Sequence, residues 1–81
     1  MEYIGIRTMA KNQVILNVGT QRRFYSYDTL ICIFDYATGK FILSGQESFF
    51  TRTTVKWLNR FLVPYGVKYS DIKNTAERKF F

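Results

Sequence analysis

The sequence predicts an α+β fold, in which a mostly antiparallel sheet of about four strands carries one amphipathic helix on a face. Two observations lead to this class. Short apolar segments of strand length, separated by turn residues, fill residues 13–44. A pattern of helical period then follows at about residues 53–62. Because 81 residues are too few to build two cores, we expect a single domain over residues 1–81.

The first strands are expected before residue 26. Residues 3–9 alternate only weakly between apolar and polar side chains. Residues 13–18 alternate clearly, with Ile15 on one face and three apolar side chains on the other, Val14, Leu16 and Val18. Gly19 and Thr20 suit a tight hairpin turn, so a third strand should run from residue 21 or 22 to residue 25.

Residues 29–34 are apolar at nearly every position, which is typical of a central strand that is covered on both sides, or covered on one side and by a partner on the other. Asp28 is expected in the turn before this strand, and Asp35 at the start of the following hairpin loop. Gly39 can adopt the left-handed conformation that closes such a loop. Residues 40–44 should then return antiparallel.

The helix is the clearest amphipathic segment of the chain. Hydroxyl groups in residues 51–54 can cap its N-terminus by accepting hydrogen bonds from free backbone amides. Its apolar arc comprises Val55, Trp57, Leu58, Phe61 and Leu62. Residues 63–66 contain a proline and a glycine, which should end the helix near Leu62. For the short C-terminal element we expect a strand through Tyr69 and then a helix capped at Ser70.

The positive charge is concentrated in the C-terminal part of the chain. Twelve Lys and Arg against six Asp and Glu give a net charge of +6. Residues 52–81 contain seven of these basic residues and only two acidic ones. This distribution suits either simple solubility or an anion-binding surface, and it excludes an inhibitor that mimics DNA, which would need a strongly negative surface.

The composition argues against catalysis. The chain has no histidine, and its one cysteine, Cys32, lies within the most apolar segment. Asp28 and Asp35 are about 23 Å apart if the strand between them is extended, which is too far to share a metal ion. The glycines are scattered singly, so no phosphate-binding loop is present. We expect no catalytic residues, no metal site and no cofactor, and therefore a protein that is not an enzyme.

Two groups of residues are candidates for binding. Arg52, Lys56 and Arg60 are spaced four residues apart on the polar side of the helix, with Asn59 beside them. Cations at this spacing can contact successive phosphates of a nucleic acid, although a solvated outer face has the same pattern. The second candidate interleaves arginines with aromatic residues that can stack on bases or pack across strands, namely Arg22, Arg23, Tyr25 and Tyr27.

Part of the chain resembles a group of small uncharacterised proteins from bacterial phages and mobile elements. The resemblance covers roughly residues 24–62. It is carried by residues 25–29 before an apolar strand and a hairpin, and by residues 51–54 followed by Lys56, Asn59 and Phe61. The group has a histidine near position 57, where this chain has Trp57. The resemblance implies an accessory protein and no known activity.

The sequence alone thus favours a small non-catalytic binding protein, whose partner is nucleic acid or an acidic, nucleic-acid-handling protein. The alternatives are an inhibitor of a host defence complex, of the anti-CRISPR kind, and a virion or assembly component. No signal peptide and no apolar run long enough to span a membrane is present, so we expect a cytoplasmic location. Phe80 and Phe81 should either pack back on the domain or join two copies in a homo-oligomer.

Overall fold

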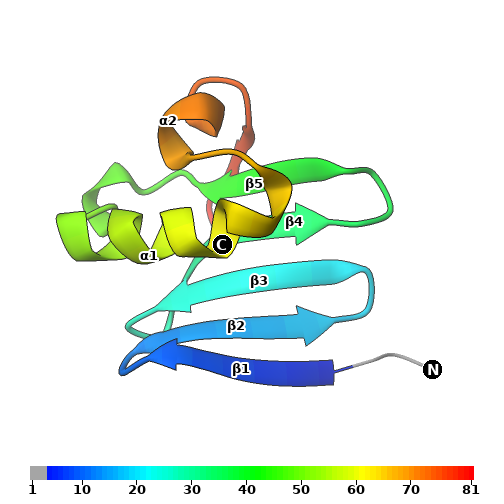
Figure 1. The fold of residues 1–81 in the computed structure, drawn as a ribbon. Coiled ribbons are helices and arrows are strands. Elements are labelled where there is room, and N and C mark those ends of the chain that lie inside the picture. Colours follow the sequence, from blue (N-terminus) through cyan, green and yellow to red (C-terminus); the bar gives the residue numbers. More distant parts are fainter. Residues whose placement is uncertain (1–3) are drawn as a thin grey trace.

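A computed structural model describes residues 4–81 and contains one six-stranded sheet whose strands follow the order of the sequence (Figure 1). The strands are β1 (Ile4–Ala10), β2 (Gln13–Val18), β3 (Gln21–Ser26), β4 (Thr29–Asp35), β5 (Lys40–Ser44) and β6 (Glu77–Lys79). All neighbours are antiparallel except β5 and β6, which are parallel. The α+β class and the mostly antiparallel sheet are confirmed.

The predicted number of four strands is too low. The weakly alternating residues 3–9 form the edge strand β1 from Ile4 onward, while Tyr3 lies outside the described residues. An edge strand has a neighbour on one side only, so its sequence needs less apolar alternation than a central strand. The sixth strand, β6, is only three residues long, and a segment this short has no periodicity to detect.

The hairpin turns contain the residues that their backbone geometry requires. Gly19 has a φ of 56° between β2 and β3, and Gly39 has a φ of 69° between β4 and β5. Tyr27 and Asp28 have φ values of 51° and 63°, so both adopt the left-handed conformation of a two-residue hairpin turn. Asp35 begins the last hairpin loop and accepts a hydrogen bond from the Ala37 amide at 2.8 Å. The expected turn positions are confirmed.

A bulge in β4 explains why three consecutive residues of this strand are buried. In the register of β3 and β4, Phe24 pairs with Cys32 and Tyr25 with Leu30, which leaves Ile31 as the extra residue. Ile31 and Cys32 therefore both join the core under the helix, whereas Ile33 is buried on the other face. The expected central strand is confirmed, with β3 and β5 as its neighbours.

Helix α1 (Arg52–Leu62) begins at its predicted cap. The Thr51 hydroxyl oxygen accepts a hydrogen bond from the Thr54 amide at 3.3 Å. The helix ends in a 3-10 turn, η2 (Val63–Tyr65), followed by Gly66 with a φ of 69°. The predicted start and stop of the helix are confirmed to within one residue.

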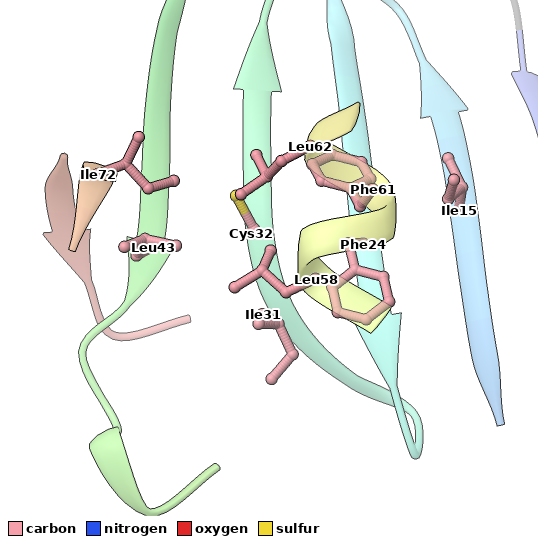
Figure 2. Packing of buried hydrophobic residues seen from close by; sticks show 9 residues of the cluster. All are labelled: Ile15, Phe24, Ile31, Cys32, Leu43, Leu58, Phe61, Leu62 and Ile72. Atoms are coloured by element: carbon pink, nitrogen blue, oxygen red, sulfur yellow. The ribbon is translucent and has the colours of Figure 1, made fainter. Parts of the chain in front are cut away.

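The core lies between α1 and one face of the sheet (Figure 2). Leu58, Phe61 and Leu62 of α1 are fully buried against side chains from β2 to β5. The rings of Phe61 and Phe24 stack with their centres 5.7 Å apart. The other core residues are Ile15, Ile31, Cys32, Leu43 and Ile72.

The C-terminal element differs from the prediction. No strand leads to Tyr69. Instead a single helical turn, α2 (Tyr69–Ile72), begins after Lys68, whose amide donates to the Asp71 carboxylate at 2.9 Å, so Ser70 is not the cap. A second short turn, η1 (Glu47–Phe49), lies between β5 and α1. Both α1 and α2 contribute to the same core, so they cover the same face of the sheet (Figure 1).

Candidate nucleic-acid interface

The outer face of α1 carries three cations in a line. Arg52, Lys56 and Arg60, which we call the basic row, are all exposed. Their spacing of four residues places them on one side of the helix, about 6 Å apart along its axis. Among residues 4–81, the ion pairs are Arg78 with Glu47 and Lys79 with Glu77, so the basic row takes part in none of them; one carboxylate, that of Asp71, lines a surface pocket together with Lys56 and Arg60.

Trp57, the single tryptophan of the chain, lies between the side chains of the basic row. It is half-buried. The Lys56 ammonium lies 5.4 Å from the centre of the indole, and the Arg60 guanidinium carbon lies 5.8 Å from it. Contacts of this kind hold the two cations near the aromatic surface without removing their charge.

The surface continues from Trp57 into a groove between the helix and the N-terminal strands. This Trp57 groove has a volume of about 360 Å³. Its lining consists of Arg7, Thr8, Met9, Ile15, Arg22, Trp57, Arg60, Val63 and Pro64. Three arginines therefore line the same groove as Trp57, and the lining has no carboxylate. Such a site attracts anions and offers an apolar surface beside them.

Arg22 has a structural role within this groove. Its Nη1 donates to the Phe61 carbonyl oxygen at 3.2 Å and to the Tyr65 hydroxyl at 3.1 Å. Its guanidinium also lies over both of these rings, at 4.9 and 5.7 Å from their centres. Burial raises the pKa of the Tyr65 phenol, so this hydroxyl stays protonated further into the alkaline range than an ordinary tyrosine. Arg22 thus fixes the end of α1 to β3.

Asn59, expected beside the cations, is turned toward α2. Its side-chain oxygen accepts a hydrogen bond from the Tyr69 amide at 2.8 Å. This bond satisfies the first backbone donor of α2 and ties the two helices together. The Asn59 oxygen is therefore used within the fold, whereas its side-chain NH₂ group, a donor, is not part of this bond, and Asn59 lines a surface pocket together with Lys56 and Arg60.

The second group predicted from the sequence is not brought together as a site. Arg23 and Tyr25 share the face of β3 that α1 does not cover, and the Arg23 Nε donates to the Gln21 side chain at 2.8 Å. Arg22 lies on the helix side. Tyr27 belongs to the turn after β3 and is 58% exposed, so it lies apart from Arg23 and Tyr25 on the strand.

Cys32, the one thiol considered for catalysis, belongs to the hydrophobic core. Cys32 is fully buried, and this burial raises the pKa of its thiol from 9.0 to about 12. A thiol with this pKa is protonated at neutral pH and is a poor nucleophile. In residues 4–81, no three His, Cys, Asp or Glu side chains are grouped so that they could hold a metal ion.

Two residues of the interface were missed from the sequence. Trp57 was assigned only to the apolar arc of the helix, although it stands directly beside Lys56. Arg7 had no local signal, because it reaches the groove through the pairing of β1 with β2, where it lies opposite Ile15. The position of Trp57 next to Lys56 on the helix could have indicated that it lies beside the basic row. That Arg7 lines the same groove could be learned only from the tertiary fold.

No helix within residues 4–81 has the length and apolar character needed to cross a membrane.

Comparison with known proteins places the chain in a family without assigning it a function. Searches of curated proteins and of solved structures gave no match. A family model, described as a family of unknown function (DUF8033), matches residues 6–78 and carries no link to phages. Because this match spans both the sheet and the helices, the chain belongs to the DUF8033 family.

Proposed function

We propose that this protein is a non-catalytic binding protein that holds nucleic acid against the outer face of α1. The observation that carries the proposal is a continuous series of cations that take part in no described ion pair. The basic row runs along the helix, and the Trp57 groove extends it with Arg7. No described carboxylate pairs with the basic row, and none lines the Trp57 groove.

The chemistry of this surface suits a phosphate backbone better than a protein partner. Exposed guanidinium and ammonium groups release counterions when they contact phosphates, which gives affinity without sequence recognition. Trp57 adds a ring on whose edge or face an unpaired base can stack. We therefore expect weak sequence preference and tighter binding to single strands than to duplexes.

The test compares two variants that each lose three positive charges. In the first, Arg52, Lys56 and Arg60 are replaced by Gln, which removes the basic row. In the matched control, Lys40, Lys73 and Lys79 are replaced by Gln; all three are exposed and lie outside the basic row and the Trp57 groove. Labelled single- and double-stranded DNA and RNA are titrated with each protein at several salt concentrations.

The slope of log K against log salt should fall by about 2 for single strands when the basic row is removed, since each lost phosphate contact lowers it by roughly 0.7. The control should keep most of the wild-type slope. Equal losses of slope in the two variants would show that only the net charge of the protein matters. The assignment of the binding site to the outer face of α1 would then be wrong. Wild-type binding no tighter than about 10⁻⁴ M at low salt would remove the nucleic-acid proposal altogether.

A further inference from the structure

The face of the sheet opposite α1 carries aliphatic side chains and has no helix over it among residues 4–81. The core and both α helices lie on the other side (Figure 1). The alternation of the paired strands places one apolar set on this second side, which we call the open face: Ile6, Val14, Leu16, Leu30, Ile33 and Ile42. Ile6 is 73% exposed. Arg23 and Tyr25 of β3 lie between the members of this set in β1 and β2 and those in β4 and β5, where Ile33 is only 5% exposed. Exposed apolar surface on a small domain is typical of an interface.

Two aromatic residues extend the open face at one end. Phe80 and Phe81 are 76% and 54% exposed. With Tyr25 and Leu30 they line a cleft of about 430 Å³. The Phe80 ring lies against the backbone of Gly45, where an added Cβ would come within 2.8 Å of the ring. The C-terminal end is thus held beside the open face, and its aromatic surface is continuous with the apolar side chains of the strands.

We propose that the open face binds a second copy of this chain, so that two sheets stack and both α1 helices point outward. The charge distribution favours this occupant. On the open face, Arg23 and Lys40 are positive and Asp35 is negative. These three residues have a net charge of +1, whereas the whole chain has a net charge of +6. Beside them, Glu77 and Lys79 form a neutral pair at 3.7 Å. Two copies that meet here keep their basic rows on opposite sides, where like charges repel least.

The available area matches what a stable dimer buries. Strands β1 to β5 have five to seven residues and β6 has three, so at about 3.3 Å per residue and about 4.8 Å between strands they make a face of roughly 500 Å². The exposed parts of Phe80 and Phe81 add about 250 Å². The sum is close to the ~800 Å² that each partner contributes to an interface of standard size. Stacked sheets pack about 10 Å apart, a distance that apolar side chains of this size fill.

The experiment measures mass against concentration for the full chain by sedimentation. The wild type should be a dimer with a Kd of about 10 μM or tighter, because interfaces of standard size have affinities from μM to pM. Leu16→Lys puts a charge within the apolar part of the open face on β2 and should weaken association at least ~10-fold. Val63→Lys is the matched control, because Val63 is 67% exposed but lies at the end of α1, away from the open face.

Circular dichroism establishes that each variant is folded. If Leu16→Lys does not fold, Ile6→Lys is used in its place to test dimerisation. The Ile6 side chain is 73% exposed and therefore contributes little to the stability of the monomer. A wild type that stays monomeric at about 0.5 mM overturns the proposal, as does a dimer unchanged by the open-face substitutions. The variant without the basic row should remain dimeric, so a failure of nucleic-acid binding and a failure of dimerisation are separate results.

Discussion

The guanidinium of Arg22 lies 4.9 Å from the centre of the Phe61 ring and donates a hydrogen bond to the backbone carbonyl oxygen of the same residue. One side chain of β3 therefore satisfies an acceptor in the last turn of α1 and covers the ring that this turn buries. Its neighbour Arg23 points to the open face and contacts only Gln21 by hydrogen bond. Two adjacent arginines thus have different roles.

Replacing Arg22 by Gln should lower the free energy of unfolding by about 1–3 kcal/mol, because the partly buried Phe61 carbonyl and Tyr65 hydroxyl lose a charged donor. Arg23→Gln is the matched control and should change it by no more than about 0.5 kcal/mol. Urea denaturation measures both. Equal destabilisation by the two substitutions would contradict the structural role assigned to Arg22.

Replacing Thr51 by Ala should cost about 1 kcal/mol of stability, since its hydroxyl caps α1. The same hydroxyl contacts Thr54 Oγ1 at 3.2 Å, which in turn lies 3.0 Å from Ser26 Oγ on β3. The exposed Thr53 provides the control, and Thr53→Ala should be neutral or slightly stabilising because alanine favours the helix. Thermal unfolding distinguishes them; an unchanged melting temperature for Thr51→Ala would show that the cap contributes nothing.

The buried thiol of Cys32 makes stability depend on pH in the alkaline range. Its pKa is about 12 in the folded chain, against 9.0 for the ordinary thiol. Below pH 9 both states keep the proton, so this group adds no pH dependence. Between pH 9 and 12 unfolding releases the proton, and the free energy of unfolding should fall by up to ~1.4 kcal/mol per pH unit.

The measurement compares the wild type with Cys32→Ala by urea denaturation at pH values from 8 to 11. The variant has a lower stability throughout because of the lost core volume, but its decline with pH should be shallower. Lysines and tyrosines titrate in both proteins, so the difference between the slopes isolates the thiol. Parallel declines would mean that Cys32 becomes accessible to hydroxide in the folded state.

Trp57 provides a direct optical signal for binding, because it is the single tryptophan of the chain. Single-stranded oligonucleotides should quench its fluorescence as bases stack near the indole. Trp57→Phe keeps an aromatic ring and should retain most of the affinity, whereas Trp57→Ala should lower the affinity by about 1–3 kcal/mol, which is roughly 5- to 150-fold. Tight binding without any quenching would place the nucleic acid away from the Trp57 groove.

The elements that the sequence predicted well are those set by neighbouring residues. The helix was located because Thr51 and Gly66 mark its ends and Leu58, Phe61 and Leu62 recur on one side. The hairpins were located because Gly19 and Gly39 supply left-handed turns. Local propensity and tertiary packing agree at these positions, so the pattern was sufficient.

The features that escaped prediction depend on contacts between distant residues. Strand β6 forms because residues 77–79 pair with β5, although α1 and α2 lie between these two strands in the sequence. Arg22 was assigned to binding because a strand arginine beside aromatics has the same sequence pattern whether it faces solvent or caps a helix. The basic row itself was found from spacing, but its continuation through Trp57 to Arg7 needed the register of β1.

The strict sequential order of the strands has a consequence for how the chain folds. Strands β1 to β5 are joined by turns of two to four residues, so each pairing closes a short loop at low entropic cost. Contacts of such low sequence separation favour rapid folding, and during synthesis these hairpins emerge from the ribosome before α1 emerges. For that interval both apolar faces of the sheet are bare. A nascent meander of this kind needs either a chaperone or early pairing with another chain, and the interval ends when α1 covers the first face.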